Sequence, residues 1–213
     1  MYCKILTLEF WSLLSFLFSK ASMIDTSTIL DFDNRVEQIK SSIKSVKDFP
    51  IKGILFRDIT TLLEDPKAYK QTIDLLYEVF KDQKIDAIAA ADARGFLFGS
   101  TLAYLLGCKL VLVRKPGKLP RKTISQTYDL EYGHATLELS KDSLKEGDRV
   151  LLVDDLLATG GTAGAMVQLV RQVKAEVVAF AFVIELFDLG GAKLLKDQYN
   201  VDVFSLVKFP GHR

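Results

Sequence analysis

The sequence predicts an α/β protein with a central, mainly parallel sheet flanked by helices. Three largely apolar runs, at residues 85–91, 149–153 and 177–184, are typical of strands buried on both faces of a sheet. Segments with apolar residues at helical spacing lie between these runs. Strands that alternate with helices along a chain indicate parallel pairing, because a helical crossover returns each strand in the same direction.

Further elements follow from local patterns. Apolar residues at helical spacing predict a helix over 33–46, and Asp65 followed by Pro66 marks the start of a second helix as N-cap and first residue. A helix over 94–106 is expected to end at Gly107. The remaining expected elements are helices over 162–173 and 192–197, strands over 110–113, 135–139 and 201–207, and a polar, mobile loop over 115–127.

The composition excludes several classes of protein. With 213 residues, 49% of them hydrophobic and 26% charged, the chain is not intrinsically disordered and has the length of one large domain or of one domain with a small appendage. The net charge of +1 gives no general attraction to nucleic acids or anionic membranes, so any anion site must be local. We expect neither a nucleic-acid partner nor stable membrane association.

The two cysteines, Cys3 and Cys108, are far apart and predict no disulfide framework, which favours a reducing compartment and a cytoplasmic location. The absence of a C-x-x-C motif and of clustered Cys and His residues argues against a zinc site. We assign no role to His134 or His212.

The first 22 residues do not match the rest of the chain. Residues 10–18 form an apolar run that is too short to span a bilayer as a helix. Small residues follow it, as in a signal peptide, but only one lysine precedes it. We interpret 1–22 as an extension outside the fold and 23–213 as a single domain that begins at Met23. A targeting segment such as a signal peptide is the alternative for 1–22. A membrane-anchored protein is a further alternative, and it rests on residues 10–18 alone.

The segment with the clearest chemistry runs from a strand into a helix at residues 150–162. Two carboxylates follow four apolar strand residues, and a loop of small and hydroxyl residues then opens a helix. Ligands of open α/β sheets bind outside the carboxyl ends of the strands, and a helix N-terminus favours a phosphate. The pattern therefore predicts a sugar phosphate site, with hydroxyls on the carboxylates and a phosphate on the loop. The residues are Asp154, Asp155, Ala158, Thr159, Gly160, Gly161 and Thr162.

Other phosphate motifs are absent from this loop. It contains neither G-x-x-x-x-G-K-[ST] nor G-x-G-x-x-G, so it is not a P-loop or a dinucleotide fingerprint. An Asp-Asp helix cap followed by a glycine turn is the structural alternative. That alternative accounts for either half of the segment but poorly for both halves together after a buried strand.

This segment resembles the 5-phosphoribosyl-1-pyrophosphate (PRPP) binding motif of type I phosphoribosyltransferases. The resemblance extends along most of residues 36–212 and is strongest to the bacterial, adenine-specific members. It is carried by residues 49–58 (FPIKGILFRD), 93–99 (ARGFLFG), 113–120 (VRKPGKLP), 128–133 (YDLEYG) and 153–162 (VDDLLATGGT). It implies the type I fold, with a small N-terminal hood around 48–58 and a mobile lid loop.

The resemblance also implies an activity: PRPP and adenine are converted to AMP and pyrophosphate in purine salvage. The implied cofactor is Mg²⁺, carried mainly by oxygens of PRPP or pyrophosphate, with no metal site made by side chains alone. A homodimer is implied as well. Two alternatives stay open, a non-catalytic PRPP or purine sensor on the same fold and a transferase for another purine base.

The resemblance assigns further residues to roles. Pyrophosphate is expected on Asp92, Ala93, Arg94, Arg114 and Lys115, often with a strained peptide between the first two. Adenine is expected against the ring of Phe56, with backbone groups of Leu55 and Arg57 reading its edge. Glu131 is expected to handle the purine proton, so the implied catalytic residues are Glu131, Arg94 and Lys115. Each of these side chains also has a plain structural reading as a surface charge or a core phenylalanine.

Ala158 bears on the choice of base. Hypoxanthine-guanine phosphoribosyltransferases resemble this motif but carry an aspartate at that position, facing N7 of a 6-oxopurine. Its absence here argues against a 6-oxopurine substrate. The YDLEYG stretch is likewise not typical of the orotate enzymes.

Overall fold

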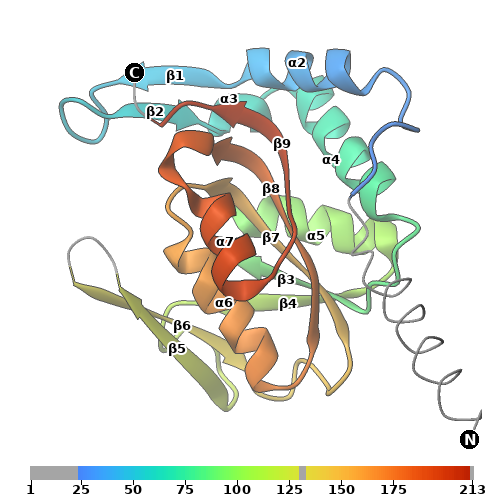
Figure 1. Cartoon of the computed structure of the whole chain (residues 1–213), viewed down its shortest axis with the longest axis vertical. Helices are drawn as coiled ribbons and strands as arrows, with labels where there is room; N and C mark the ends of the chain where they lie inside the picture. The colour runs from blue at the N-terminus through green and yellow to red at the C-terminus, as the bar shows by residue number, and fades with distance from the viewer. Residues whose placement is uncertain (1–23, 130–132, 212–213) are drawn as a thin grey trace, which may run out of the picture.

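The computed structural model describes residues 24–129 and 133–211. Two β-sheets and a set of helices make up these residues (Figure 1). The elements in chain order are α2 (Phe32–Ser42), β1 (Lys44–Lys47), β2 (Leu55–Asp58), α3 (Thr60–Leu63), α4 (Pro66–Phe80), β3 (Ala87–Ala91), α5 (Gly95–Leu106), β4 (Lys109–Arg114), β5 (Thr123–Asp129), β6 (His134–Ser140), β7 (Arg149–Leu157), α6 (Gly161–Gln172), β8 (Glu176–Leu186), the 3-10 helix η1 (Phe187–Leu189), α7 (Gly191–Tyr199) and β9 (Val203–Phe209).

The main sheet has seven strands in the order β5-β6-β4-β3-β7-β8-β9. Its five strands from β4 to β9 are parallel, and β5 and β6 add an antiparallel edge, so the expected mainly parallel α/β fold is confirmed. The chain leaves β3 through α5 toward β4 on one side, and leaves β7 through α6 toward β8 on the other. The switch point lies between β3 and β7, where ligands of such sheets bind.

Helices cover both faces of this sheet, so its central strands are buried on both sides (Figure 1). Ile88 and Ala90 of β3 point into a core shared with α2, α4 and α5. Ala87 and Ala89 point into the opposite core, which α6 and α7 close. This alternation explains why the strand sequence is apolar at every position.

The N-terminal hairpin differs from the expectation of a helix over 33–46. The helix α2 ends at Ser42, and Lys44–Lys47 form the exposed strand β1, paired antiparallel with β2. Thr61 supports the change of direction because its hydroxyl donates to the Ser42 carbonyl (2.6 Å) and accepts from the Lys44 N–H (3.0 Å). The helix α2 therefore ends where it contacts α3. The spacing of apolar residues in the sequence does not reveal such a contact. The hairpin lies beside the C-terminal end of β9 (Figure 1).

The polar loop expected over 115–127 also contains regular structure. Strand β5 begins at Thr123 and pairs with β6 in an antiparallel hairpin. Ile124 and Tyr128 pack against the core that α6 closes, while alternate side chains face outward. One half-buried face is enough to form a strand, although the polar composition of the segment suggests a loop.

Two helix boundaries agree with the sequence. The Asp65 side chain accepts hydrogen bonds from the N–H groups of Lys67 and Ala68, as an N-cap does. Gly107 has a φ of 65° at the C-cap of α5. Among the described residues, no helix combines the length and apolar character needed to cross a bilayer.

Gly99 fixes how closely α5 approaches β3, and a substitution at this position tests whether that close packing is required. A Cβ at position 99 would lie 2.7 Å from the Cβ of Ala90, closer than side chains pack. Gly99→Ala would gain about 1 kcal/mol of helix propensity but lose about 1–3 kcal/mol to overpacking. We expect a net loss and a melting temperature lowered by several degrees in calorimetry.

The neighbouring exposed residue provides the matched control. Ser100→Ala changes the same helix without a clash and is expected to leave the melting temperature within about 2 °C of wild type. A Gly99→Ala protein as stable as the Ser100→Ala protein would contradict the close packing of α5 on β3.

Candidate functional site

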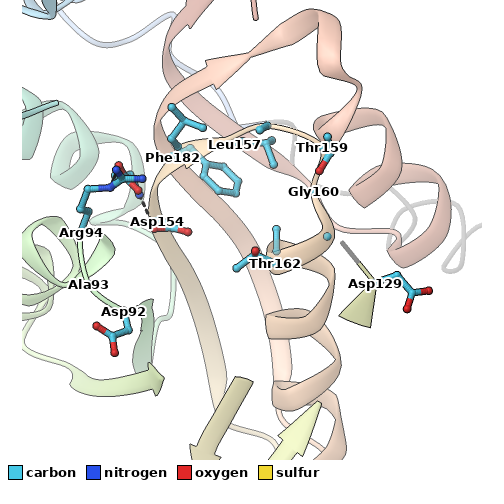
Figure 2. Close-up of a pocket in the computed structure, with 15 residues that line it drawn as sticks. Asp92, Ala93, Arg94, Asp129, Asp154, Leu157, Thr159, Gly160, Thr162 and Phe182 are labelled. Atoms are coloured by element: carbon cyan, nitrogen blue, oxygen red, sulfur yellow. Dashed lines mark hydrogen bonds and ion pairs between the residues drawn. The ribbon is translucent and has the colours of Figure 1, made fainter. Parts of the chain in front are cut away.

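A cavity of about 810 Å³ lies at the switch point, outside the carboxyl ends of β3 and β7 (Figure 2). Figure 2 shows Asp92 and Arg94 on one side of it, Thr159 and Thr162 on the other, and Asp154 between them. The lining residues are Asp92, Ala93, Arg94, Asp129, Asp154, Asp155, Leu156, Leu157, Ala158, Thr159, Gly160, Gly161, Thr162, Ala163 and Phe182. The structure thus joins the strand-to-helix segment to the loop after β3, which the sequence separates by some 60 residues.

The two carboxylates lie inside strand β7, which continues to Leu157 rather than ending at Val153 as expected. Burial raises the pKa of the Asp154 carboxyl well above its usual value, and the neighbouring charge of Asp155 adds to the effect. Burial also raises the pKa of Asp155, against the opposing influence of Arg94. The Asp154 carboxylate accepts a hydrogen bond from the Asp155 N–H (2.8 Å). The pair therefore forms a concentrated, poorly solvated group of acceptors.

Arg94 stands across from this pair at the end of the loop after β3. Its Nε lies 2.6 Å from an Asp155 carboxylate oxygen, and its side chain is half exposed while that of Asp155 is 5% exposed. A guanidinium has five N–H donors, so the ion pair leaves others for a second anion. The peptide bond between Asp92 and Ala93 is cis.

Gly95 lets this arginine-bearing loop approach the carboxylates. A Cβ at position 95 would lie 2.9 Å from the carbonyl oxygen of Val153 and 3.0 Å from a carboxylate oxygen of Asp154. A side chain there would push the first turn of α5 away from β7. The glycine therefore sets the distance between the arginine and the acidic pair.

The loop at 158–162 is held by its own backbone and by α7. Gly160 has a φ of 90°, a conformation that favours glycine, and it leaves the start of α6 without a capping side chain. Gly191, at the start of α7, is so close that a Cβ on it would lie 2.3 Å from the Ala158 carbonyl oxygen. The N–H groups at the start of α6 and the Thr159 and Thr162 hydroxyls can therefore bind an anion.

Two predicted pyrophosphate residues do not line the cavity of this chain. Arg114 ends β4, where its Nε donates to a carboxylate oxygen of Asp92 (2.9 Å) and its guanidinium lies over the ring of Phe96 (5.9 Å). It therefore supports the loop that carries Arg94. Lys115 follows it on the exposed surface.

The predicted adenine residues are in the hairpin, which also lies outside the cavity lining. The Phe56 ring contacts the Phe49 ring edge-on at 5.0 Å. The buried Arg57 side chain points away from solvent, donating to the Pro210 carbonyl (3.0 Å) and covering the Phe209 ring at 4.5 Å. The Arg57 side chain is therefore engaged within the protein. Glu131 is outside the described residues.

Five lining residues had no predicted role: Asp129, Leu156, Leu157, Ala163 and Phe182. Leu156, Leu157 and Ala163 lie in or next to the strand-to-helix segment. There, the alternation of side chains along the strand could have indicated that they line the cavity. Phe182 pairs in register with Asp154 across β7 and β8, a contact that a single sequence does not reveal. Among the described residues, no group of three or more His, Cys, Asp or Glu side chains is arranged to hold a metal ion.

Comparisons with known proteins agree with this fold. The family model described as "Phosphoribosyl transferase domain" matches residues 58–211. The chain is 57% identical over 178 residues to the adenine phosphoribosyltransferase of Escherichia coli O157:H7 (strain EC4115 / EHEC), covering 84% of this chain and 97% of that protein.

Two solved structures extend the comparison. The crystal structure of adenine phosphoribosyltransferase from Thermoanaerobacter pseudethanolicus is 50% identical, with a TM-score of 0.77 over 82% of this chain and 99% of that one. The enzyme from Trypanosoma brucei, in complex with AMP, pyrophosphate and ribose-5-phosphate, is 28% identical, with a TM-score of 0.76 over 82% and 79% of the two chains.

These matches establish that the chain belongs to the phosphoribosyltransferase family. The family model covers both the loop after β3 and the strand-to-helix segment, so it includes the two sides of the cavity. Within that family the chain belongs to the adenine phosphoribosyltransferases, as the resemblance in the sequence predicted.

The raised pKa of Asp154 predicts how stability changes with pH. The folded chain holds this proton more tightly than the unfolded chain, so wild-type stability falls as the pH rises through the folded-state pKa. Asn carries no such proton, so Asp154→Asn is expected to melt at a higher temperature than wild type at pH 8. The difference should shrink toward pH 4, where the unfolded carboxyl is itself protonated, at a pKa of about 3.9.

Calorimetry at several pH values measures this difference. Asp142→Asn is the matched control because Asp142 is exposed and paired only with Arg121 at the surface. The melting temperature of Asp142→Asn should not rise above that of wild type at pH 8 in the same way. A wild type more stable than Asp154→Asn at pH 8 would mean that the buried carboxylate is stabilised in its charged form.

Proposed function

We propose that this chain transfers the 5-phosphoribosyl group from PRPP to adenine in the cavity at the switch point. The reaction, which gives AMP and pyrophosphate, is the activity of the adenine phosphoribosyltransferases, the family to which the chain belongs. One observation supports its location best: a buried carboxylate pair lies between an anion-binding loop and an arginine within one cavity. PRPP has the same order of groups, with hydroxyls between two phosphate-bearing ends.

Each part of PRPP has a place in this proposal. The 5-phosphate binds the 158–162 loop, where backbone N–H groups and two threonine hydroxyls supply donors. The ribose hydroxyls donate to Asp154 and Asp155. The pyrophosphate binds at Asp92, Ala93 and Arg94, with Arg114 acting on the same end through its ion pair with Asp92. Lys115 lies next to Arg114 in sequence and adds positive charge there.

The chemistry follows from these charges. Displacement at the anomeric carbon builds positive charge on the ribose and negative charge on the leaving pyrophosphate. Asp154 and Asp155 favour the positive charge on the ribose. Arg94 stabilises the negative charge on the pyrophosphate while its Nε remains paired with Asp155. Electrostatic stabilisation of this kind is strongest where water is excluded, as at this buried pair.

Magnesium fits this donor set as a partner of the substrate. Asp155 is buried and Asp154 half-buried, and they are engaged with each other and with Arg94, so phosphate oxygens and waters are the better ligands for the ion. When bound with PRPP, the ion neutralises charge on the leaving group. The side chains of this chain then position the ribose and the pyrophosphate around it.

Adenine is proposed to bind under the hairpin, which acts as a hood over the cavity. The ring of Phe56 offers a stacking surface, and Arg57 is buried, so it contacts the base through its backbone, as does Leu55. Several exposed apolar side chains surround this position on the hairpin: Val46, Phe49, Ile51 and Ile54. Glu131 is proposed, on the family resemblance, to accept the proton that adenine loses.

We also propose a homodimer in which the outer face of α5 is the interface. Leu97, Tyr104 and Leu105 lie on this helix at positions seven and eight apart, and each is at least 40% exposed. Leu110 of β4, which lies next to Gly99 of α5, adds an exposed apolar side chain. Contiguous apolar patches exposed on a monomer mark association sites, and Arg94 is the N-cap of this helix.

Two further proposals come from the sequence. Residues 1–22 are proposed to be dispensable, because every segment that carries the family resemblance lies beyond residue 35. A cytoplasmic location is proposed because the chain has only two cysteines, and Cys108 is free.

The dimer predicts a change of mass on substitution. Tyr104→Glu combined with Leu105→Glu places two charges on the proposed interface and is expected to convert a dimer of about twice 23.8 kDa into a monomer. Light scattering after gel filtration measures this. Leu30→Glu, at an 86% exposed leucine elsewhere, is the control and should leave the dimer intact. A wild type that elutes as a monomer at micromolar concentration would contradict the interface.

Base choice predicts a clear preference. With PRPP and Mg²⁺, adenine should exceed hypoxanthine, guanine and orotate by at least about 100-fold in kcat/KM, because a site built to hydrogen-bond one base leaves its groups unpaired with another. Release of pyrophosphate is the measurement. Ala158→Asp alone is not expected to switch the preference, since the hood still reads adenine. Comparable rates with adenine and hypoxanthine would contradict the proposed base site.

A further inference from the structure

Strand β5 reaches the anion-binding loop through Tyr128. The Tyr128 hydroxyl oxygen lies 3.0 Å from the hydroxyl oxygen of Thr162, in the first turn of α6. The ring also lies along Gly161, since a Cβ on that glycine would be 3.4 Å from the Cδ2 atom of Tyr128. The next residue along the strand, Asp129, lines the cavity itself (Figure 2). A residue of the hairpin is thus in contact with the loop proposed to hold the 5-phosphate.

The strand is held in this position along its length. Gln172, in the last turn of α6, donates to the Ser125 carbonyl (3.3 Å) and to the Gln126 side chain (2.9 Å). Contacts at both ends of α6 therefore fix β5 against this helix. Tyr128 is half-buried by the packing, which restricts its ring and aims its hydroxyl at Thr162.

The hydrogen bond between the Tyr128 and Thr162 hydroxyls leaves one O–H donor unused. The two hydroxyls carry two protons, and the bond between them uses one, whichever oxygen donates. The other proton remains available, and a phosphate oxygen can only accept in a hydrogen bond with it. In a chain of hydrogen bonds each bond polarises the next, which strengthens donation to the anion.

We propose that Tyr128 is a positioning residue for the 5-phosphate: it orients the Thr162 hydroxyl so that the pair presents one O–H donor to the phosphate. This inference rests on the proposed function, because it assumes that the 5-phosphate binds at 158–162. It assigns the strand before residues 130–132 a role in holding PRPP, separate from the base and from the pyrophosphate.

The neighbouring residue offers a matched control. Thr127 points to the opposite side of β5, where its hydroxyl bonds the Thr136 hydroxyl (2.9 Å) on the exposed face of the hairpin. Thr127→Val and Tyr128→Phe each remove one hydroxyl from a hydroxyl pair on the same strand. Only the second pair adjoins the cavity.

Binding of two probes to the full-length chain tests the proposal. Calorimetry with ribose 5-phosphate should show a dissociation constant raised about three- to tenfold in Tyr128→Phe, as expected for one hydrogen bond. Pyrophosphate, which binds at the other end of the cavity, should keep its wild-type affinity. Thr127→Val should bind both probes as wild type does. In steady-state assays, KM for PRPP should rise in Tyr128→Phe while kcat changes less than twofold.

A double-mutant cycle separates positioning from general loosening. If Tyr128 acts through Thr162, then Tyr128→Phe should add little to the effect of Thr162→Val on ribose 5-phosphate binding. Additive losses, a Tyr128→Phe affinity equal to wild type, or equal losses for both probes would each overturn the proposal. Failure of the wild-type chain to bind PRPP at all would instead contradict the proposed function, so the two failures are distinguishable.

Discussion

The burial of two adjacent carboxylates at the switch point of the sheet is the constraint on which the rest of the site depends. Asp154 and Asp155 are placed in β7 by the strand itself, at a cost in desolvation that raises the pKa of both. Arg94 offsets part of that cost from the neighbouring loop. The arginine must therefore come close to β7, and the packing of α5 against the sheet serves this requirement.

Three glycines make this approach possible from different elements. Gly95 lets the first turn of α5 touch β7, and Gly99 seats the middle of the same helix on β3. On the other side, Gly191 lets α7 support the 158–162 loop from behind. Each is a place where a Cβ would meet another part of the chain, so these close contacts determine how near the loop after β3 and the 158–162 loop come to the carboxylates.

The sequence was sufficient wherever function and local pattern coincide. The segment 150–162 shows a strand, two carboxylates and a helix start in succession, so the order of its elements was predictable, although β7 continues through the carboxylates to Leu157. Tertiary contacts explain the features of the structure that the sequence did not predict. Thr61 ends α2 earlier than helical spacing suggests, and packing against α6 makes β5 a strand despite its polar composition. Phe182 joins the cavity through its register with Asp154, and Arg114 turns toward Asp92; neither follows from one sequence.

In the proposed binding mode, the arrangement of charge also explains how one cavity would hold a substrate with negative charge at both ends. The acidic pair lies between the two ends and would repel either phosphate if it stood alone. Arg94 contacts the pair from the end proposed for pyrophosphate, whereas the helix dipole of α6 and its uncapped N-terminal N–H groups lie at the end proposed for the 5-phosphate. Because the two ends use different sources of positive potential on different elements, the ribose in the middle can face acceptors only. In that proposed mode, the same separation would leave the anomeric carbon beside negative charge, which would favour the positive charge that develops there as pyrophosphate leaves.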